Sequence, residues 1–256
     1  MNHHPKPRRW GAFLAATLMA LGLIVAAPGV QAAEALTPAQ RAAVDQAIHD
    51  YILAHPDVVV EAIKAAQQKS DEQSAEHVRQ MISEKRKDLL ENPDDLVLGN
   101  AKGDATLVEF FDYRCPYCKQ IEPVIDALLK EDPKLRVVYK EFPILGEASI
   151  YATRVALAAK KQGKYPEFHH AMMMAKGDIN SDFILKVASS VGLDLTKLKT
   201  DIASPDIDRI IRANYDLADV LDIHGTPGLI IGDTSLPGAV DLDTLRKQVA
   251  LARLHE

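Results

Sequence analysis

The spacing of two cysteines limits the folds open to this chain more than any other feature. Cys115 and Cys118 are separated by Pro116 and Tyr117, and the sequence has no other cysteine. A strand-like apolar run, Thr106 to Phe111, precedes the pair, and apolar residues at helical spacing follow it. Unpaired N–H groups and the positive dipole end of a helix start favour a thiolate at Cys115. One turn further on, Cys118 is placed to close a disulfide with it, so the pair is predicted to be redox-active.

A zinc site and a structural disulfide are weaker interpretations of the cysteine pair. Half of a zinc site would need a second cysteine pair or histidines at ligand spacing, and the sequence offers neither. An inert structural disulfide between residues two positions apart would close a very small ring and constrain little of the unfolded chain.

Residues 1–32 have the pattern of a signal peptide. Three basic residues begin the segment, an uncharged apolar run extends from Gly11 to Ala27, and Val30-Gln31-Ala32 supplies a small-residue cleavage site. The alternative is an uncleaved membrane anchor, because no charge follows until Glu34. The cleavage site favours the signal peptide, and we expect it to be cut after Ala32. The protein would then be exported to the periplasm, which is an oxidising compartment.

The charge of the mature chain excludes some partners. Removing the leader takes away three basic and no acidic residues, so the formal net charge moves from −6 to −9. This balance argues against nucleic acid as a partner and provides no polybasic surface for a membrane. Roughly 224 residues remain, enough for one domain with a real core and an appendage.

Residues 33–94 are predicted to form a helical region. Thr37-Pro38-Ala39-Gln40 has the pattern of a helix start with a capping box, and His55-Pro56-Asp57 separates two helices. The first helix carries an apolar stripe made of Val44, Ile48, Tyr51 and Ile52. This region has too few apolar residues to form a core of its own, so its stripe must pack on the next domain or on copies of itself. We favour the second possibility, an oligomerisation module. The polar interval 67–77 is either an exposed helix or a hinge.

The remainder, residues 95–256, predicts an α/β domain. The helix that begins at the cysteine pair (the redox helix) is followed by a predicted strand from Leu135 to Phe142. The next strand-like stretch is Gly228 to Ile231. Helical patterns fill the interval of about 147–222. We therefore expect a helical domain inserted into a strand–helix–strand fold.

Two further features surround the predicted redox centre. Glu109 lies six residues before Cys115 in an apolar strand, where a buried carboxyl could relay protons to Cys118; the alternative is an ordinary glutamate at a solvated edge. Thr226-Pro227 begins a strand, which predicts a cis peptide bond. The Thr226 backbone would then lie across from Cys115, where a substrate strand can pair with it.

His169-His170 and Met172-Met173-Met174 invite a copper interpretation, since both residue types bind copper ions. Consecutive residues of a helix point in different directions and cannot form one tight site. Core packing is the better account, and no metal site is predicted.

These residues resemble the DsbA-like family of exported thiol–disulfide oxidoreductases, which have a thioredoxin fold. The matching segments are VEFFDYRCPYCK (108–119), KEFPILG (140–146) and GTPGLIIGD (225–233). The resemblance implies the following roles: Cys115 as nucleophile, Cys118 as resolving thiol, Pro227 as cis-proline, Thr226, Pro116 and Tyr117 as substrate-binding residues, and Glu109 and Glu122 as a proton relay.

The N-terminal region resembles that of ScsC-type proteins through YILAHPDV (51–58) and EAI (61–63). That resemblance implies disulfide isomerisation, copper tolerance and a trimer. Two departures separate the chain from strongly oxidising relatives: Tyr117 stands where they have histidine, and Thr226 before the cis-proline is more typical of isomerases.

The predicted function is therefore a disulfide isomerase or reductase that acts on exported proteins and is reset by a membrane redox partner, with no cofactor. A DsbA-type oxidase is the alternative within the family, because the motif fixes the chemistry but not its direction. Alternatives from other classes are a Cu(I)-binding copper-tolerance protein, with the two thiolates as soft ligands, and a holdase-like chaperone.

Overall fold

The computed structural model describes residues 36–254. The described chain forms two compact units, and the boundary between them lies between Ala62 and Ile63. The first unit contains helix α1 (Pro38–Ala54) and the beginning of α2 (Pro56–Glu84). Within residues 36–254, no helix combines the length and the apolar character needed to span a membrane. The predicted signal peptide lies outside the described residues, and the predicted domain boundary between residues 94 and 95 stays a prediction.

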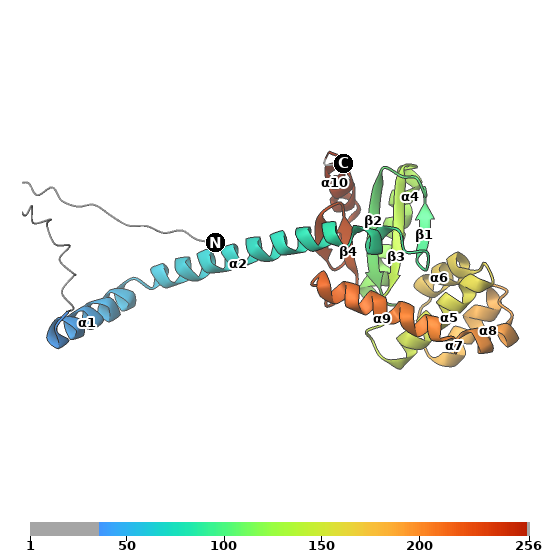
Figure 1. Ribbon diagram of the computed structural model, residues 1–256, viewed down its shortest axis with the longest axis horizontal. Coiled ribbons are helices and arrows are strands. Elements are labelled where there is room, and N and C mark those ends of the chain that lie inside the picture. The colour runs from blue at the N-terminus through green and yellow to red at the C-terminus, as the bar shows by residue number, and fades with distance from the viewer. Residues whose placement is uncertain (1–35, 255–256) are drawn as a thin grey trace, which may run out of the picture. The chain divides into compact units, whose positions relative to one another are not determined.

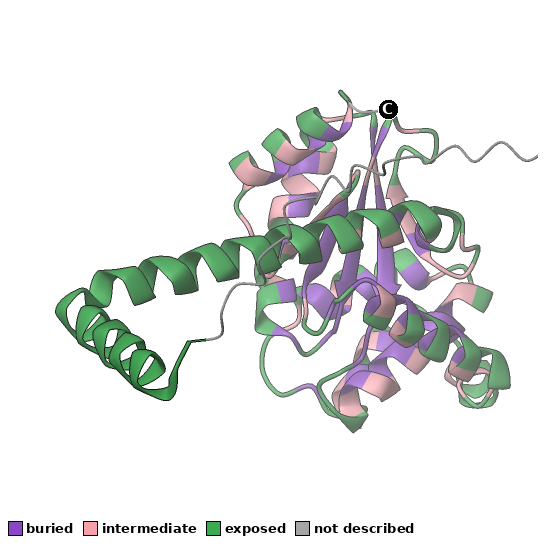
Figure 2. Ribbon diagram, turned by 60° about the vertical axis from the view of Figure 1, so that its left-hand side comes forward, coloured by how far each residue is buried: buried purple, intermediate pink, exposed green. Residues whose placement is uncertain are grey.

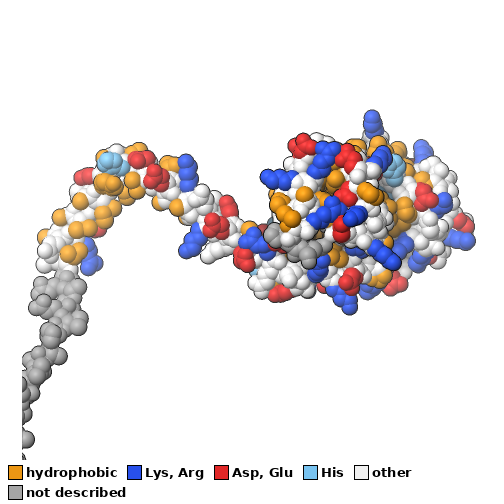
Figure 3. Space-filling view, turned by 90° about the horizontal axis from the view of Figure 1, so that it is seen from above, with side chains coloured by type: hydrophobic (Ala, Val, Ile, Leu, Met, Phe, Trp, Pro, Cys, Tyr) orange, Lys and Arg blue, Asp and Glu red, His pale blue; other side chains and the backbone are white. Residues whose placement is uncertain are grey.

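Helix α1 forms as the sequence predicts, and its apolar stripe is uncovered. Thr37 caps the helix through a complete capping box with Gln40. No residue of α1 is buried (Figure 2), and the apolar side chains of Val44, Ile48 and Tyr51 are 45–55% exposed. Figure 3 shows hydrophobic side chains along this part of the chain. The polar interval 67–77 is an exposed stretch of helix α2.

The second unit is built on a five-stranded sheet in the order β1-β3-β2-β4-β5 (Figure 1). The strands are β1 (Leu96–Gly99), β2 (Ala105–Phe111), β3 (Leu135–Glu141), β4 (Gly228–Ile231) and β5 (Thr234–Pro237). Strands β2 and β3 pair in parallel and are joined by helix α4 (Pro116–Glu131), whereas the other pairs are antiparallel. This is a thioredoxin fold, as predicted.

A helical insertion separates β3 from β4, also as predicted. Its helices are α5 (Glu147–Lys161), α6 (Tyr165–Met174), α7 (Ser181–Ser190), α8 (Leu195–Asp201) and α9 (Pro205–Val220). The other helices of this unit are α3 (Arg86–Leu90), α4 (Pro116–Glu131) and α10 (Leu242–Ala252). Asp241 caps α10 by accepting a hydrogen bond from the Thr244 N–H.

Both faces of the sheet are covered, so its strands are apolar on both sides. Alternate residues of β2, such as Leu107 and Phe111, join the core formed with α4, α10 and the insertion. Val108 and Phe110 face the other way, into a core that includes Leu89 of α3 and residues of α9. The end of α2 and α3 therefore belong to the packing of this domain.

One buried ion pair lies on the α3 and α9 side of the sheet. Lys140 of β3 is fully buried, and its Nζ lies 2.6 Å from Oδ2 of Asp95. The same ammonium donates a hydrogen bond to the Asp88 carbonyl oxygen in α3. Burial lowers the pKa of Lys140 and raises that of Asp95 to about 6. The pair thus connects α3, the start of β1 and the sheet.

Replacing one partner of this pair should be far worse than replacing both. Asp95→Ala leaves a buried ammonium without its counter-charge, which costs about 3–5 kcal/mol of unfolding free energy, whereas Asp95→Ala with Lys140→Met should recover most of that loss. Urea unfolding measures both. Lys164→Met, which removes an exposed pair with Glu167, should change stability far less than Asp95→Ala, because water and salt screen an exposed pair. A double variant as unstable as Asp95→Ala would contradict this account.

Candidate functional site

Cys115 is the N-cap residue of helix α4, with Pro116 at the first helical position. Its backbone N–H donates to the Asp112 carbonyl oxygen at 3.0 Å. The buried Asp112 carboxylate accepts hydrogen bonds from the N–H groups of Arg114 and Leu145, which holds the loop before the helix. Pro116 is exposed and Tyr117 is 61% exposed, so the turn between the cysteines faces solvent.

The two thiols have opposite electrostatic surroundings. Hydrogen bonding from the Cys118 side chain, supported by the Thr226 side chain and the N–H groups at the helix start, lowers the pKa of Cys115 to about 6 against the opposing effect of burial. Burial raises the pKa of Cys118, which is fully enclosed. Cys115 therefore supplies the thiolate at neutral pH, and Cys118 keeps its proton.

Glu109 lies on the α4 face of β2 and is fully buried, not at a solvated edge. Neither carboxyl oxygen makes a hydrogen bond of ordinary geometry, and burial raises the pKa of this group well above its usual value. The negative charges of Glu122 and Cys115 act in the same direction, whereas the Cys118 thiol partly offsets them. A carboxyl in these surroundings takes up a proton more readily than an exposed one, close to Cys118.

The Thr226–Pro227 peptide bond is cis, as the sequence predicts. Pro227 is buried and Thr226 is half-buried at the start of β4. The Cys115 thiol donates a hydrogen bond to the Thr226 carbonyl oxygen at 3.1 Å, across 111 residues of sequence. The structure thus brings Cys115, Cys118, Thr226 and Pro227 together.

Glu122 points from α4 into a buried polar cluster. Its Oε2 accepts a hydrogen bond from the Tyr139 hydroxyl at 3.4 Å, and its Oε1 lies 3.5 Å from Nε2 of His169. Glu122 and His169 are both almost completely buried. The ring of His169 packs against those of Phe111 and Tyr139, with centroids 4.9 and 4.4 Å away.

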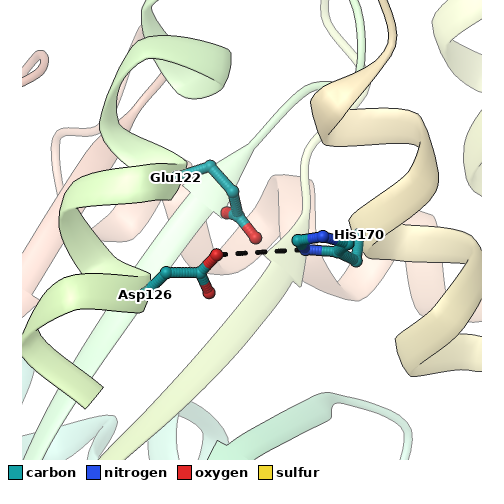
Figure 4. A group of neighbouring side chains, drawn as sticks. All are labelled: Glu122, Asp126 and His170. Carbon is teal, nitrogen blue, oxygen red and sulfur yellow. Dashed lines mark ion pairs between the residues drawn. The ribbon is translucent and has the colours of Figure 1, made fainter. Parts of the chain in front are cut away.

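Figure 4 shows a neighbouring group made of Glu122, Asp126 and His170. Their potential ligand atoms lie within 4.8 Å of one another, and His170 Nδ1 is 4.0 Å from Asp126 Oδ2. We assign no metal to this group, because Tyr139 and His169 already engage Glu122 and because His170 is exposed.

Lys119 connects the redox helix to the insertion. Its Nζ donates to the carbonyl oxygens of Met172 and Ala175 at 2.5 and 3.0 Å, near the end of α6. Burial lowers the pKa of this ammonium to about 8. A groove of about 420 Å³ lies beside it, lined by Arg114, Pro116 and residues 175–179.

Three residues around the site were not predicted from the sequence: Lys119, Tyr139 and Glu141. The sequence predicts core packing for His169, His170 and the methionines at 172–174; His169, Met172 and Met173 are buried, whereas His170 and Met174 are exposed. The ring nitrogens of His169 face polar groups. Its position beside the redox helix depends on the packing of the insertion, for which local sequence carries no signal. The sequence carries one signal for the polar role of His169, which is a histidine at a position of the helix where an apolar residue is expected.

The pKa of Cys115 can be measured by alkylation. The rate of iodoacetamide addition to the reduced protein, followed by mass spectrometry, should rise with a midpoint near pH 6, since only the thiolate reacts. Cys118→Ala should move the midpoint toward the ordinary value of 9.0, whereas Cys118→Ser, which keeps a hydrogen-bond donor, should move it less.

Because the folded-state pKa of Cys115 is lowered, its thiolate stabilises the reduced protein above pH 9, and this stabilisation is lost as the pH falls toward 6. A wild-type midpoint near 9 would contradict the assignment.

Comparisons with known proteins agree with this geometry. Residues 106–250 match the family described as "DSBA-like thioredoxin domain", and residues 40–73 match the "Copper resistance protein ScsC N-terminal domain". By sequence, the chain is 28% identical over 164 residues to the Na⁺/H⁺ antiporter NhaA 3 of Salinispora tropica. The match covers 63% of this chain but only 25% of the antiporter, so the chain spans about a quarter of that relative's length.

Solved structures resemble the chain over more of their length. A thioredoxin-like oxidoreductase from Silicibacter pomeroyi is 43% identical, with 66% of this chain and 98% of the other covered and a TM-score of 0.65. A linker-deletion variant of ScsC from Proteus mirabilis is 26% identical, with 88% and 100% covered and a TM-score of 0.66. The thiol-disulfide exchange protein α-DsbA2 from Wolbachia pipientis is 32% identical, with 69% and 96% covered and a TM-score of 0.65. The chain therefore belongs to the DsbA-like thioredoxin-domain family, a family of thiol–disulfide oxidoreductases.

Proposed function

We propose that this protein is a periplasmic thiol–disulfide oxidoreductase that works mainly as an isomerase or reductase on exported proteins. The observation that carries the proposal is the position of Cys115. Its thiol ionises near pH 6 and lies 3.1 Å from the Thr226 carbonyl oxygen. A substrate strand that pairs with the Thr226 backbone would bring its own disulfide to this sulfur.

The chemistry proceeds by thiol–disulfide exchange. The Cys115 thiolate attacks one sulfur of a substrate disulfide, a mixed disulfide forms, and the other substrate sulfur leaves as a thiolate. In isomerisation, another substrate thiolate attacks the mixed disulfide and regenerates the Cys115 thiolate. In reduction, Cys118 attacks the Cys115 sulfur, which leaves a Cys115–Cys118 disulfide and a reduced substrate. A membrane redox partner that donates two electrons would then restore the thiols.

Glu109 is proposed to handle the proton of Cys118 in the reduction step. Cys118 must lose its proton to attack, and burial makes the bare thiolate unfavourable. The nearby Glu109 carboxyl, with its own pKa raised by burial, is matched to accept this proton and to return it in the reverse step. Glu122, which acts electrostatically on Glu109, is proposed as the next group in this relay.

Glu109→Gln should slow the step that depends on Cys118 and leave the attack by Cys115 unchanged. Gln keeps the size of the side chain but cannot accept the proton, so decay of the mixed disulfide with a peptide substrate should slow by about tenfold or more. Acid quenching and mass spectrometry follow the intermediate. In a Cys118→Ala background, which accumulates the mixed disulfide, the same substitution should change the formation rate far less than it slows the decay. Unchanged decay would remove Glu109 from the mechanism.

The isomerase direction is supported by the uncovered apolar stripe of α1. An isomerase must hold misfolded substrates long enough for other substrate thiols to attack, and several catalytic domains in one assembly would prolong that contact. The stripe formed by Val44, Ile48, Tyr51 and Ile52 is exposed in the single chain. We propose that copies of this chain cover it, with a trimer as the expected assembly.

Ile48→Glu should dissociate the assembly by placing a charge in the stripe. Gln46→Glu, which adds the same charge on the other side of the helix, is the matched control. Light scattering at micromolar concentration should show an oligomer for wild type and Gln46→Glu, and a monomer for Ile48→Glu. The monomer should lose refolding of a scrambled multi-disulfide substrate but keep reduction of a small disulfide.

A truncated chain that begins at Ile63 provides a second comparison. This start retains Ile82 and Leu89, which pack on the sheet. Equal isomerase activity of the monomeric and assembled proteins would refute a role for α1. If neither isomerises but both oxidise a reduced substrate, the oxidase alternative holds. The Cu(I)-binding and chaperone alternatives stay predictions.

A further inference from the structure

A buried carboxyl on β3 fixes the hydrogen-bond directions beside the redox helix. Oε1 of Glu141 accepts hydrogen bonds from the hydroxyls of Tyr113 and Tyr165 at 3.0 and 2.7 Å, and Oε2 lies 2.6 Å from Oγ1 of Thr153. Burial raises the pKa of both tyrosines well above the usual value, so both keep their protons. Burial raises the pKa of Glu141 to about 7, and when this carboxyl is ionised, the two phenols that converge on its Oε1 must both donate to it.

This arrangement determines the protonation of one nitrogen of His169. Nδ1 of His169 lies 3.3 Å from the Tyr113 oxygen. A tyrosine hydroxyl has one proton, and that of Tyr113 is already directed to Glu141. The Tyr113 oxygen can therefore only accept from His169, so Nδ1 must carry a hydrogen.

The other nitrogen of His169 faces Glu122. Nε2 is fully buried and lies 3.5 Å from Oε1 of Glu122, and it makes no hydrogen bond of ordinary geometry among the described residues. With Nδ1 protonated, a neutral ring presents a lone pair at Nε2. A bare Nε2 against an ionised carboxylate would bury two lone pairs face to face, which is unfavourable because neither group then has a hydrogen-bond partner there. One proton between the two groups removes this conflict.

We propose that His169 and Glu122 hold one proton between them and that His169, acting through Glu122, keeps this part of the redox centre without net charge. The proton resides on Glu122 beside a neutral ring, or on Nε2 beside a carboxylate, and both states sum to zero. His169 is thus a positioning residue rather than a catalytic one. Its effect on the cysteines rests on the proposed function, whereas the shared proton does not.

The consequence for the site is electrostatic. Glu122 acts by charge on Glu109, and Glu109 acts on both cysteines. An uncompensated charge on Glu122 would oppose ionisation of Glu109 and of the Cys115 thiol beyond it. The titratable groups that face His169 are Glu122 from α4, Tyr139 from β3 and Tyr113 from the loop after β2, with Glu141 and Tyr165 behind Tyr113.

The first test needs no variant. ¹⁵N NMR of histidine-labelled, reduced wild-type protein at about pH 8, where Glu141 is mostly ionised, distinguishes a protonated ring nitrogen from a bare one. For His169, assigned by its absence from His169→Asn, Nδ1 should be protonated and Nε2 should be hydrogen-bonded. A ring protonated on Nε2 alone would overturn the proposal, whatever the protein's activity.

The second test measures the pH midpoint of Cys115 alkylation. His169→Asn keeps a donor at the Nδ1 position but lacks Nε2, so Glu122 can ionise without compensation and the midpoint should rise by about 0.5 pH unit or more. Glu122→Gln removes the charge and should leave the midpoint within about 0.2 unit of wild type, as should the double variant with His169→Asn. His170→Asn, at the exposed neighbouring position of α6, is the matched control and should also leave it unchanged.

If the double variant returns to the wild-type midpoint, the shift in His169→Asn comes from the charge on Glu122 and not from structural damage. If the double variant stays shifted like His169→Asn, or if His169→Asn has the wild-type midpoint, the proposed role of His169 is wrong. If His169→Asn does not fold, Glu122→Gln and the NMR measurement still decide: a Glu122→Gln midpoint displaced by a full unit would mean that wild-type Glu122 bears an uncompensated charge. Failure of the enzyme assays alone would refute the proposed function and leave the shared proton standing.

Discussion

The alternation of side chains along β2 and β3 is the constraint on which the redox centre depends. The strands pair in parallel, with Glu109 opposite Tyr139 and Phe111 opposite Glu141. Because successive side chains of a strand point to opposite faces, this register places Glu109, Tyr139 and Glu141 beneath α4. A slip of one residue in β3 would present Lys140 to the cysteines instead. The pairing of two strands therefore selects the chemistry available to the thiols.

The two faces of the sheet treat buried charge differently. On the α3 and α9 side, Lys140 and Asp95 form a close ion pair, which joins elements and satisfies both charges. On the α4 side, Glu109 is buried without such a partner, and burial raises its pKa. A buried group that has no fixed counter-ion costs stability and has a shifted pKa, and such groups are typical of sites where chemistry occurs. The asymmetry separates a structural face of the sheet from a reactive one.

Features coded by short stretches of chain were predictable from the sequence. The capping box at Thr37, the cap at Asp241, the strand from Gly228 to Ile231 and the cis bond before Pro227 all follow from neighbouring residues. The cysteine pair and the burial of Glu109 could be predicted in the same way. Contacts between distant segments could not: Tyr113 meets Glu141 across 28 residues and His169 across 56. Those contacts depend on strand register and on how the insertion packs, and neither leaves a periodic pattern in the sequence.

Lys119 joins helix α4 to the helical insertion. It directly follows the second cysteine, and its ammonium binds carbonyl oxygens of Met172 and Ala175 at the end of α6. Carbonyls at a helix C-terminus lack partners within the helix, so the side chain acts as a strut between the redox helix and the insertion. A hinge motion of the insertion would have to break these bonds. The groove lined by Arg114, Pro116 and residues 175–179 has one wall from each segment, so the Lys119 side chain links its two walls.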